Sequence, residues 1–105
     1  MNIDEIESKY TPMTEPSCYI LIAITKESRH GYAIMQYVKQ ITNNKITITN
    51  GTLYGILSRM ETDGLISIVN KDDKKAYEIT SLGLKILTNE KNRIKELLSN
   101  LERIL

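Results

Sequence analysis

The sequence has little of what disulfide bonds, zinc sites or membrane spans require. Its single cysteine cannot form a disulfide within the chain, and no set of Cys and His residues has zinc-site spacing. No apolar stretch approaches the roughly 20 residues that cross a bilayer, and the N-terminal residues lack the apolar run of a signal peptide. We therefore expect a soluble, cytoplasmic protein without a metal or another cofactor.

The sequence also lacks an excess of charge of either sign. A formal net charge of +1 over 105 residues neither supports nor excludes a nucleic-acid partner. No nucleophile, base or carboxylate pair has a recognisable catalytic spacing, so we expect no enzyme. His30 is predicted to cap or pack at a helix start, and Cys18 to be inert because it lies in an apolar run.

One short helix, from Asn50 to about Asp63, has clear start, period and stop signals. Its apolar residues recur at i, i+3, i+4 and i+7 and are Leu53, Ile56, Leu57 and Met60. This spacing places them on one face, which is predicted to pack against a core. Thr49 or Asn50 can cap the N-terminus, and Gly64 can supply the left-handed residue that ends the helix.

The opposite face of this helix carries mostly small or hydrogen-bonding side chains. They are Thr52, Gly55, Ser58, Arg59 and Thr62, with Tyr54 near the edge. Because only Arg59 is long and positively charged, such a face can approach another molecule closely. An ordinary amphipathic core helix is the alternative interpretation.

Two further helices are predicted before this one. Thr14 has the features of an N-cap, and the apolar run from Cys18 to Ile24 predicts a central helix that is covered on most sides. A second helix is predicted from Tyr32 to Thr42, with an apolar face made of Ile34, Met35, Val38 and Ile41.

Three short strands are predicted around the helix that starts at Asn50. Alternation over Ile46–Thr49 suggests a strand just before it; Leu65–Asn70 and Ala76–Thr80 suggest two strands after it, joined by the charged tip Lys71–Lys75. The order helix, helix, strand, helix, strand, strand is that of a winged helix-turn-helix. The predicted fold class is therefore mainly α with a small β-wing.

The last predicted helix is too long for so small a core. Thr80 or Ser81 can cap it and no proline follows up to Leu105, so it spans about 24 residues, or roughly 36 Å. It carries an apolar seam at coiled-coil spacing that consists of Leu87, Ile94, Leu97, Leu98, Leu101, Ile104 and Leu105. We expect the seam to pack against the same helix of a second subunit, because closed two-fold dimers are the commonest oligomers. Folding back onto the N-terminal arm is the alternative.

These elements divide the chain into three parts. Residues 1–13 form an arm in which Ile3, Ile6 and Tyr10 have helical spacing, so the arm either docks as a short helix or frays. Residues 14–80 form the winged helix-turn-helix, and residues 81–105 form the dimerisation helix.

Several of these residues together resemble a known family. In chain order they are His30-Gly31-Tyr32, Gly51-Thr52-Leu53-Tyr54, Leu57, Arg59, Gly64-Leu65-Ile66, Tyr77, Ile79-Thr80 and Gly83. Their order and spacing resemble the PadR family of bacterial transcriptional regulators. The resemblance implies a homodimeric, cytoplasmic winged-helix repressor that binds pseudo-palindromic operator DNA and is often released by a small aromatic or drug-like ligand.

Two features depart from the family pattern. Members that bind ligands tend to have a basic, glycine-rich wing and a tryptophan in the last helix at the dimer centre. In this chain the wing tip is Lys71-Asp72-Asp73-Lys74-Lys75, and there is no tryptophan. Ile94 stands near the position of that aromatic residue.

An α-helix fits the major groove, so we expect the helix from Asn50 to lie there, with the wing on flanking DNA and the two helices of a dimer about 34 Å apart. The candidate DNA-binding residues are Tyr32, Thr49, Asn50, Thr52, Tyr54, Ser58, Arg59, Lys71, Lys74 and Lys75. Structural alternatives remain: a salt bridge from Arg59 to Asp63 at i+4, packed rings for Tyr32 and Tyr54, and a solvated hairpin tip.

An effector site and a different function complete the predictions. A dimer framed by long helices could hold an apolar ligand among Met13, Tyr19, Ile94 and Leu98, and a ligand that prefers one helix spacing would draw the dimer away from DNA. The alternative function is a winged-helix module that binds proteins and not DNA, which the near-neutral charge would suit.

Overall fold

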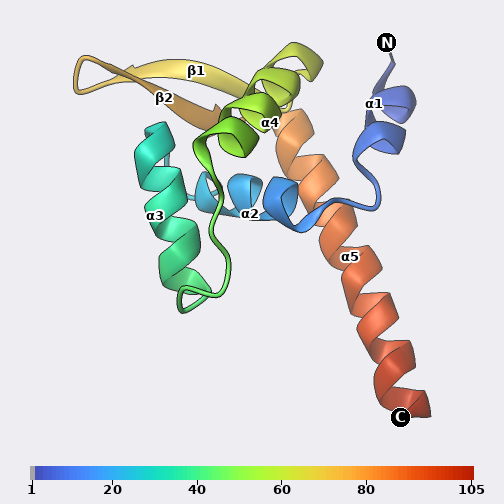
Figure 1. Cartoon of the computed structure of the whole chain (residues 1–105). Coiled ribbons are helices and arrows are strands. Elements are labelled where there is room, and N and C mark those ends of the chain that lie inside the picture. The colour runs from blue at the N-terminus through green and yellow to red at the C-terminus, as the bar shows by residue number, and fades with distance from the viewer. Residues whose placement is uncertain (1) are drawn as a thin grey trace.

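Five helices and one β-hairpin make up residues 2–105, the part of the chain that the computed structural model describes (Figure 1). In chain order they are α1 (Ile3–Tyr10), α2 (Glu15–Ala23), α3 (Gly31–Ile41), α4 (Asn50–Asp63), β1 (Ile66–Lys71), β2 (Lys74–Ile79) and α5 (Ser81–Ile104). Met1, the first residue of the predicted arm, lies outside the described residues. The predicted fold class, mainly α with a small β-wing and a long last helix, is confirmed.

Three helices begin at the predicted capping threonines. The hydroxyl oxygens of Thr14, Thr49 and Thr80 each accept a hydrogen bond from the backbone N–H three residues later, at 3.3, 3.4 and 3.1 Å. These bonds satisfy amide groups that the first helical turn leaves without a partner. Gly64 has a φ of 84° and ends α4 in the left-handed conformation, as predicted.

The hydrophobic core surrounds α2, which crosses the middle of the molecule (Figure 1). Its largest fully buried apolar residues are Ile20, Leu21, Ile24, Ile34, Val38, Leu53, Leu57, Met60, Leu65 and Ile86. The predicted apolar face of α4 is confirmed, since each of its four residues is at most 8% exposed. Ile41 was wrongly assigned to the core; it is 43% exposed because α3 ends there and the chain turns away.

The predicted strand over residues 46–49 does not form. This described segment is extended, with Ile48 buried and Thr47 exposed, but it pairs with no other strand of residues 2–105. Its alternation therefore reflects burial of every second side chain and not sheet pairing. The hairpin instead forms an isolated bridge to Arg29, just before α3, through two backbone hydrogen bonds with Tyr77.

The hairpin turn is shorter than the predicted five-residue tip. Lys71 pairs with Lys74 in the antiparallel ladder, which leaves only Asp72 and Asp73 in the turn. Both aspartates have positive φ, 54° and 61°, as in the type I′ turn that suits the twist of a two-residue hairpin. Lys71, Lys74 and Lys75 are consequently strand residues at the end of the wing.

The N-terminal arm docks on the body as helix α1. Ile6 and Tyr10 are buried, and Glu7 accepts a hydrogen bond from the side-chain amide of Asn89 on α5. Beyond α1, the backbone N–H of Met13 donates to the carboxylate of Glu90 at 2.9 Å. This packing decides between the docked and the frayed arm in favour of docking.

Glu90 is a buried charge, 1% exposed, at the centre of this joint. Arg93 donates to both of its carboxylate oxygens, at 2.7 and 2.8 Å. This ion pair, helped by the Met13 amide, lowers the pKa of Glu90 although burial acts in the opposite direction. Glu90 therefore stays ionised and fixes the segment after α1 to α5.

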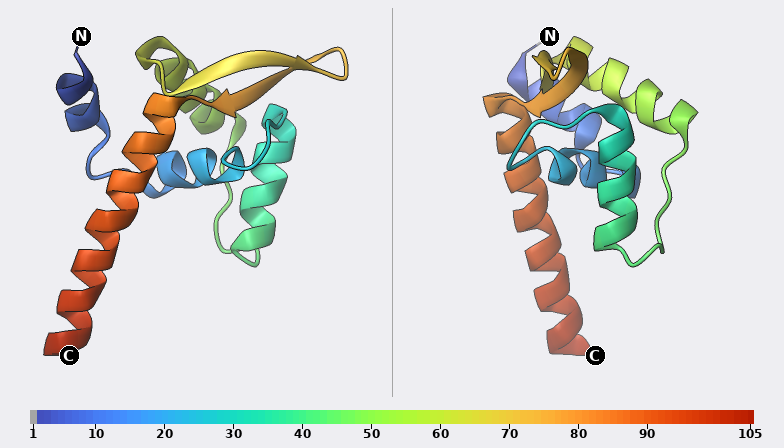
Figure 2. Two further views of the ribbon diagram at one scale, coloured as in Figure 1. Left: turned by 180° about the vertical axis from the view of Figure 1, so that it is seen from behind. Right: turned by 90° about the vertical axis from the view of Figure 1, so that its left-hand side faces the viewer.

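The second half of α5 projects away from the other elements in every ribbon view (Figures 1 and 2). On this half the predicted seam is exposed: Ile94, Leu97, Leu98, Leu101 and Ile104 are between 43% and 72% exposed. Leu87, the first residue of the seam, is partly buried against the core. The arm does not cover the seam, so the fold-back alternative is wrong. None of the described helices has the length and apolar character to cross a membrane.

Candidate nucleic-acid interface

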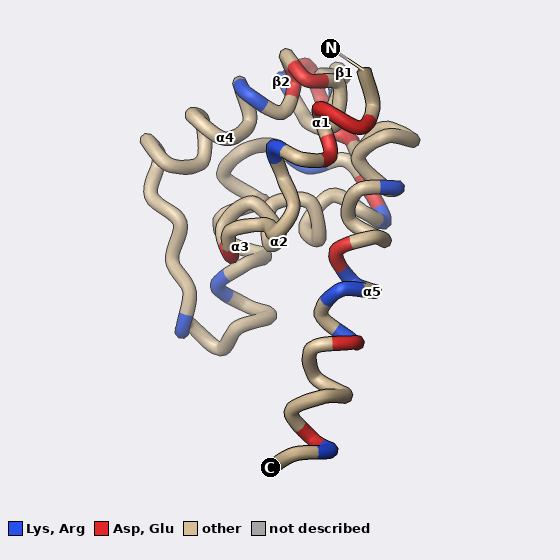
Figure 3. Tube along the Cα trace, turned by 90° about the vertical axis from the view of Figure 1, so that its right-hand side faces the viewer, with Lys and Arg blue, Asp and Glu red and all other residues tan. Residues whose placement is uncertain are grey.

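Helix α4 has one buried face and one free face. Thr52, Gly55, Ser58, Arg59 and Thr62 are all exposed, opposite the four residues that pack in the core. The helix and the loop that precedes it lie on the side of the molecule away from α5 (Figure 2, right; Figure 3). The predicted division of α4 into a core face and an accessible face is therefore confirmed.

Two glycines on α4 have no role in packing. A Cβ atom added at Gly51 or Gly55 would meet no other atom within 4 Å, and neither residue has a positive φ. A glycine inside a helix costs about 1 kcal/mol relative to alanine. The packing of the fold therefore does not require glycine at these two positions. A slim helix surface does, however, permit close approach of another molecule.

Tyr54 links α4 to the start of α3 and still faces solvent. A Cβ on Gly31 would lie 2.4 Å from the Tyr54 hydroxyl oxygen, so the phenol occupies the space that this glycine leaves open. The Tyr54 side chain is nevertheless 48% exposed. Tyr32 is 66% exposed, and its hydroxyl oxygen accepts a hydrogen bond from Gln36. Tyr54 thus packs its phenol against the start of α3 while about half of the residue remains exposed.

The wing is tied to the segment before α3 by side chains as well as by the backbone. His30 Nδ1 lies 3.0 Å from the carbonyl oxygen of Lys75, which can only accept, so this nitrogen carries the proton. Lys71 Nζ donates to the carbonyl oxygen of Ser28 at 2.8 Å. His30 occupies the predicted cap position of α3 but makes no side-chain capping bond. The structure thus gives Lys71 a bracing role and leaves Lys74 and Lys75 exposed.

The charged side chains from the start of α3 to the third turn of α4 are of one sign. No Asp or Glu occurs between Gly31 and Ser58, and the charged residues of this stretch are Lys39 and Lys45. Both lysines are exposed. The sequence prediction missed both residues because it used the net charge; the run without acidic residues would have revealed them.

The salt bridge between Arg59 and Asp63, the structural alternative for Arg59, does not form. Asp63 instead pairs with Lys9 of α1, at 2.9 Å, while the Arg59 guanidinium lies 5.8 Å from the centre of the Tyr10 ring. The reason is tertiary: α1 packs against the end of α4 and supplies other partners. Arg59 consequently remains an exposed cation on the free face of α4.

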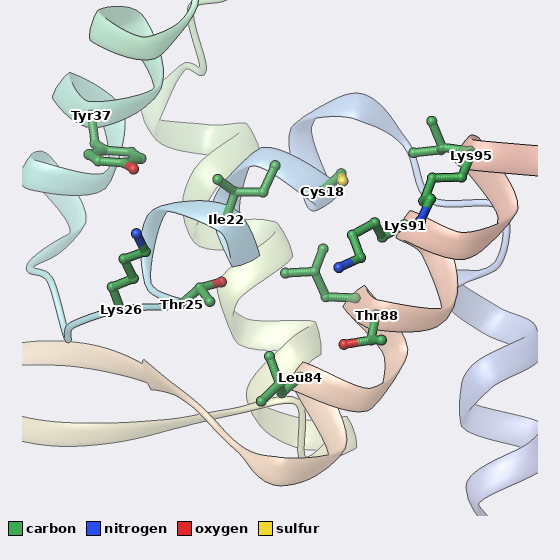
Figure 4. A pocket seen from close by; sticks show the side chains of 11 residues that line it. Cys18, Ile22, Thr25, Lys26, Tyr37, Leu84, Thr88, Lys91 and Lys95 are labelled. Atoms are coloured by element: carbon green, nitrogen blue, oxygen red, sulfur yellow. The ribbon is translucent and has the colours of Figure 1, made fainter. Parts of the chain in front are cut away.

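A cavity of about 450 Å³ lies between α2, α3 and α5, on the other side of the molecule (Figure 4). It is mostly apolar, with Lys26, Lys91 and Lys95 among its lining residues. Of the four predicted effector residues only Ile94 lines it; Met13 and Tyr19 pack elsewhere on the core. Cys18 also lines it, and burial raises the pKa of its thiol, as predicted.

A comparison with protein-family models assigns the chain to a family. A family model described as "Transcriptional regulator PadR-like family" matches residues 20–89, from α2 to the first half of α5. The chain belongs to the PadR-like family. The resemblance predicted from the motifs is thereby confirmed, and the members of this family are transcriptional regulators and not enzymes.

This PadR-like protein is also similar to individual proteins, and the solved structures among them share its fold. A curated relative from Lysinibacillus sphaericus, described as "Uncharacterized protein X", is 36% identical over 87 residues, which cover 75% of this chain and 80% of the relative. The crystal structure of a PadR-like regulator from Bacillus cereus is similar with a TM-score of 0.72 at 24% identity, over 85% of this chain and 88% of that chain. TubR from Bacillus thuringiensis, bound to 24 bp of tubC, has a TM-score of 0.66 at 17% identity, over 89% and 96%.

Replacing Gly55 by alanine should stabilise this PadR-like protein. The added methyl group enters open space and reduces the backbone entropy that folding costs, so we expect the free energy of unfolding to rise by about 0.5–1 kcal/mol in urea denaturation. Gly83→Ala is the matched control, because its Cβ would lie 2.1 Å from the Leu65 carbonyl oxygen and must destabilise the fold. A loss of stability in Gly55→Ala would show that the fold itself requires this glycine.

Proposed function

We propose that this PadR-like protein is a homodimeric repressor that binds operator DNA with α4 in the major groove and the β1–β2 wing on the flanking duplex. The observation that carries the proposal is the free face of α4. It is exposed, slim and free of acidic side chains over its first three turns, and it contains two glycines for which the fold has no use.

The start of α4 suits contact with a phosphate and with base edges. Thr49 caps the helix, and backbone N–H groups and the positive end of the helix dipole favour an anion at this terminus. We assign base or phosphate contacts to Asn50, Thr52 and Ser58, which can donate and accept hydrogen bonds at base edges. The Tyr54 hydroxyl and Arg59 are assigned to phosphates.

Lysines on both sides of α4 supply the charge that holds a duplex. Lys39 lies near the end of α3 and Lys45 in the loop that leads to α4. Lys74 and Lys75 stand at the end of the wing, which is braced to the segment at the start of α3 by His30 and Lys71. Phosphate contacts of this kind fix the register of a protein on DNA without reading its sequence. TubR, a neighbour in fold, is bound to DNA in its crystal structure, which supports a DNA partner for this chain.

The exposed seam of α5 supports the dimer. A row of half-exposed leucines and isoleucines on an isolated helix is unfavourable in water, and a second copy related by two-fold symmetry would cover it with the same residues. Such a dimer would present two α4 helices, for which we expect a spacing of about 34 Å. Repression follows when the dimer occupies promoter DNA. Our candidate effector, which would release the dimer from DNA, is an apolar anion bound in the lysine-lined cavity beside Ile94.

A DNA titration tests the proposal. We expect the purified protein to bind its own upstream DNA saturably, with log K falling against log salt at a slope of about −0.9 per phosphate contact. Thr52→Glu should abolish binding by placing a negative charge on the free face. It should leave the fold intact, because a glutamate three residues after the Thr49 cap completes a capping box.

The control for this titration carries the same charge elsewhere. Ser99→Glu lies on the side of α5 away from the seam and should bind like the wild type. Gly55→Ala should bind more weakly although it is the more stable protein. A wild type with neither saturable binding nor a salt slope would instead support a protein-interaction module.

Disrupting the seam should separate the subunits. We expect the wild type to sediment at twice the 12.0 kDa mass of the chain, and the double variant Leu98→Glu Leu101→Glu to sediment as a monomer that binds the operator far more weakly. Ser99→Glu again serves as the control and should remain dimeric. A wild type that is monomeric at concentrations where it saturates the operator would refute dimeric binding.

A further inference from the structure

Helix α1 holds the carboxylate of Asp63 at the end of the recognition helix. Lys9 Nζ donates to both carboxylate oxygens, at 3.1 and 2.9 Å, and the Tyr10 hydroxyl donates to one of them at 2.8 Å. The Asp63 side chain is only 7% exposed as a result. We call these three residues, Lys9, Tyr10 and Asp63, the Asp63 latch.

Arg59 stands four residues before Asp63 on the same helix, a spacing at which an arginine and an aspartate readily pair. In the structure it makes no ion pair with Asp63, and its guanidinium lies beside the Tyr10 ring. The Arg59 residue thus remains exposed on the face assigned to DNA. Arg59 is also the only basic residue on α4.

We propose that the Asp63 latch keeps Arg59 available to a DNA phosphate by occupying the carboxylate that would otherwise neutralise it. Lys9 and Tyr10 are then positioning residues for DNA binding, although neither lies on α4. The proposal rests on the proposed function, because it assigns a phosphate to Arg59.

The protonation states agree with this role. The hydrogen bond from Lys9 lowers the pKa of Asp63, so the carboxylate is ionised near neutral pH. If Lys9 and Tyr10 released this carboxylate, it would attract Arg59. Burial, followed by the bond to Asp63, raises the pKa of Tyr10 to about 12, so its hydroxyl keeps the proton that it donates. Buried Ile6 and the bond between Glu7 and Asn89 hold α1 in place.

Opening the latch should weaken DNA binding, and removing the released charge should restore it. We expect Lys9→Met Tyr10→Phe to bind the operator about a hundredfold more weakly, because one charged hydrogen bond per subunit, and hence two per dimer, is lost. The salt slope should be smaller by about 0.9 per subunit. Adding Asp63→Asn should return the affinity to within about twofold of wild type. A merely structural role for α1 does not predict this rescue.

Two controls isolate the latch. Lys85→Met removes a lysine charge from an exposed position of α5 and should leave most of the affinity. In an Arg59→Gln background, opening the latch should have no further effect on DNA binding. Unchanged affinity in the opened latch, or no rescue by Asp63→Asn, would overturn the proposal.

A measurement without DNA separates this proposal from the proposed function. In Lys9→Met Tyr10→Phe, an NMR titration of the Asp63 carboxyl should show a pKa that remains low while Arg59 is present and rises in Lys9→Met Tyr10→Phe Arg59→Gln. A pKa that rises to the ordinary range of aspartate with Arg59 present would overturn the latch. If this exchange of partners occurs but the wild type binds no DNA, the proposed function fails instead.

Discussion

The packing of α4 against α2 and α3 is the constraint on which the rest of the molecule depends. Leu53, Ile56, Leu57 and Met60 are almost fully buried, and each such side chain contributes about 1.5–3 kcal/mol when it leaves water. Because a helix is rigid about its own axis, burying this face fixes the direction of the opposite one. The polar face therefore points outward, and none of its own side chains is needed to hold it in that direction.

The other elements restrict the position of that face from three directions. Tyr54 and Gly31 meet where α4 passes the start of α3, and His30 joins the same point to the wing. At the far end of α4, α1 pairs with Asp63 and is itself fixed to α5. The free face of α4, the wing and α5 therefore form one connected framework, so that the proposed dimer through α5 would set the positions of both α4 helices.

Most of the fold could be predicted from the sequence because the decisive signals are local. Capping threonines, the left-handed Gly64 and the apolar period of α4 each act within a few residues. The missing strand and the pairing of Asp63 depend on contacts between distant segments. Residues 46–49 alternate like a strand but have no partner strand, and Asp63 pairs with residues 53 and 54 positions away, which its own helix could not reveal. The exposed face of α4 followed from periodicity, whereas Lys39 and Lys45 required attention to the local distribution of charge.

Hydroxyl-radical footprinting of the protein on its own upstream DNA tests the central claim most directly, since it reports where each recognition helix lies on the duplex. Two helices in successive major grooves should protect two patches whose centres are about 10 bp apart, one turn of B-DNA. A single protected patch, or two patches at a spacing that no two-fold dimer through α5 could span, would contradict the account.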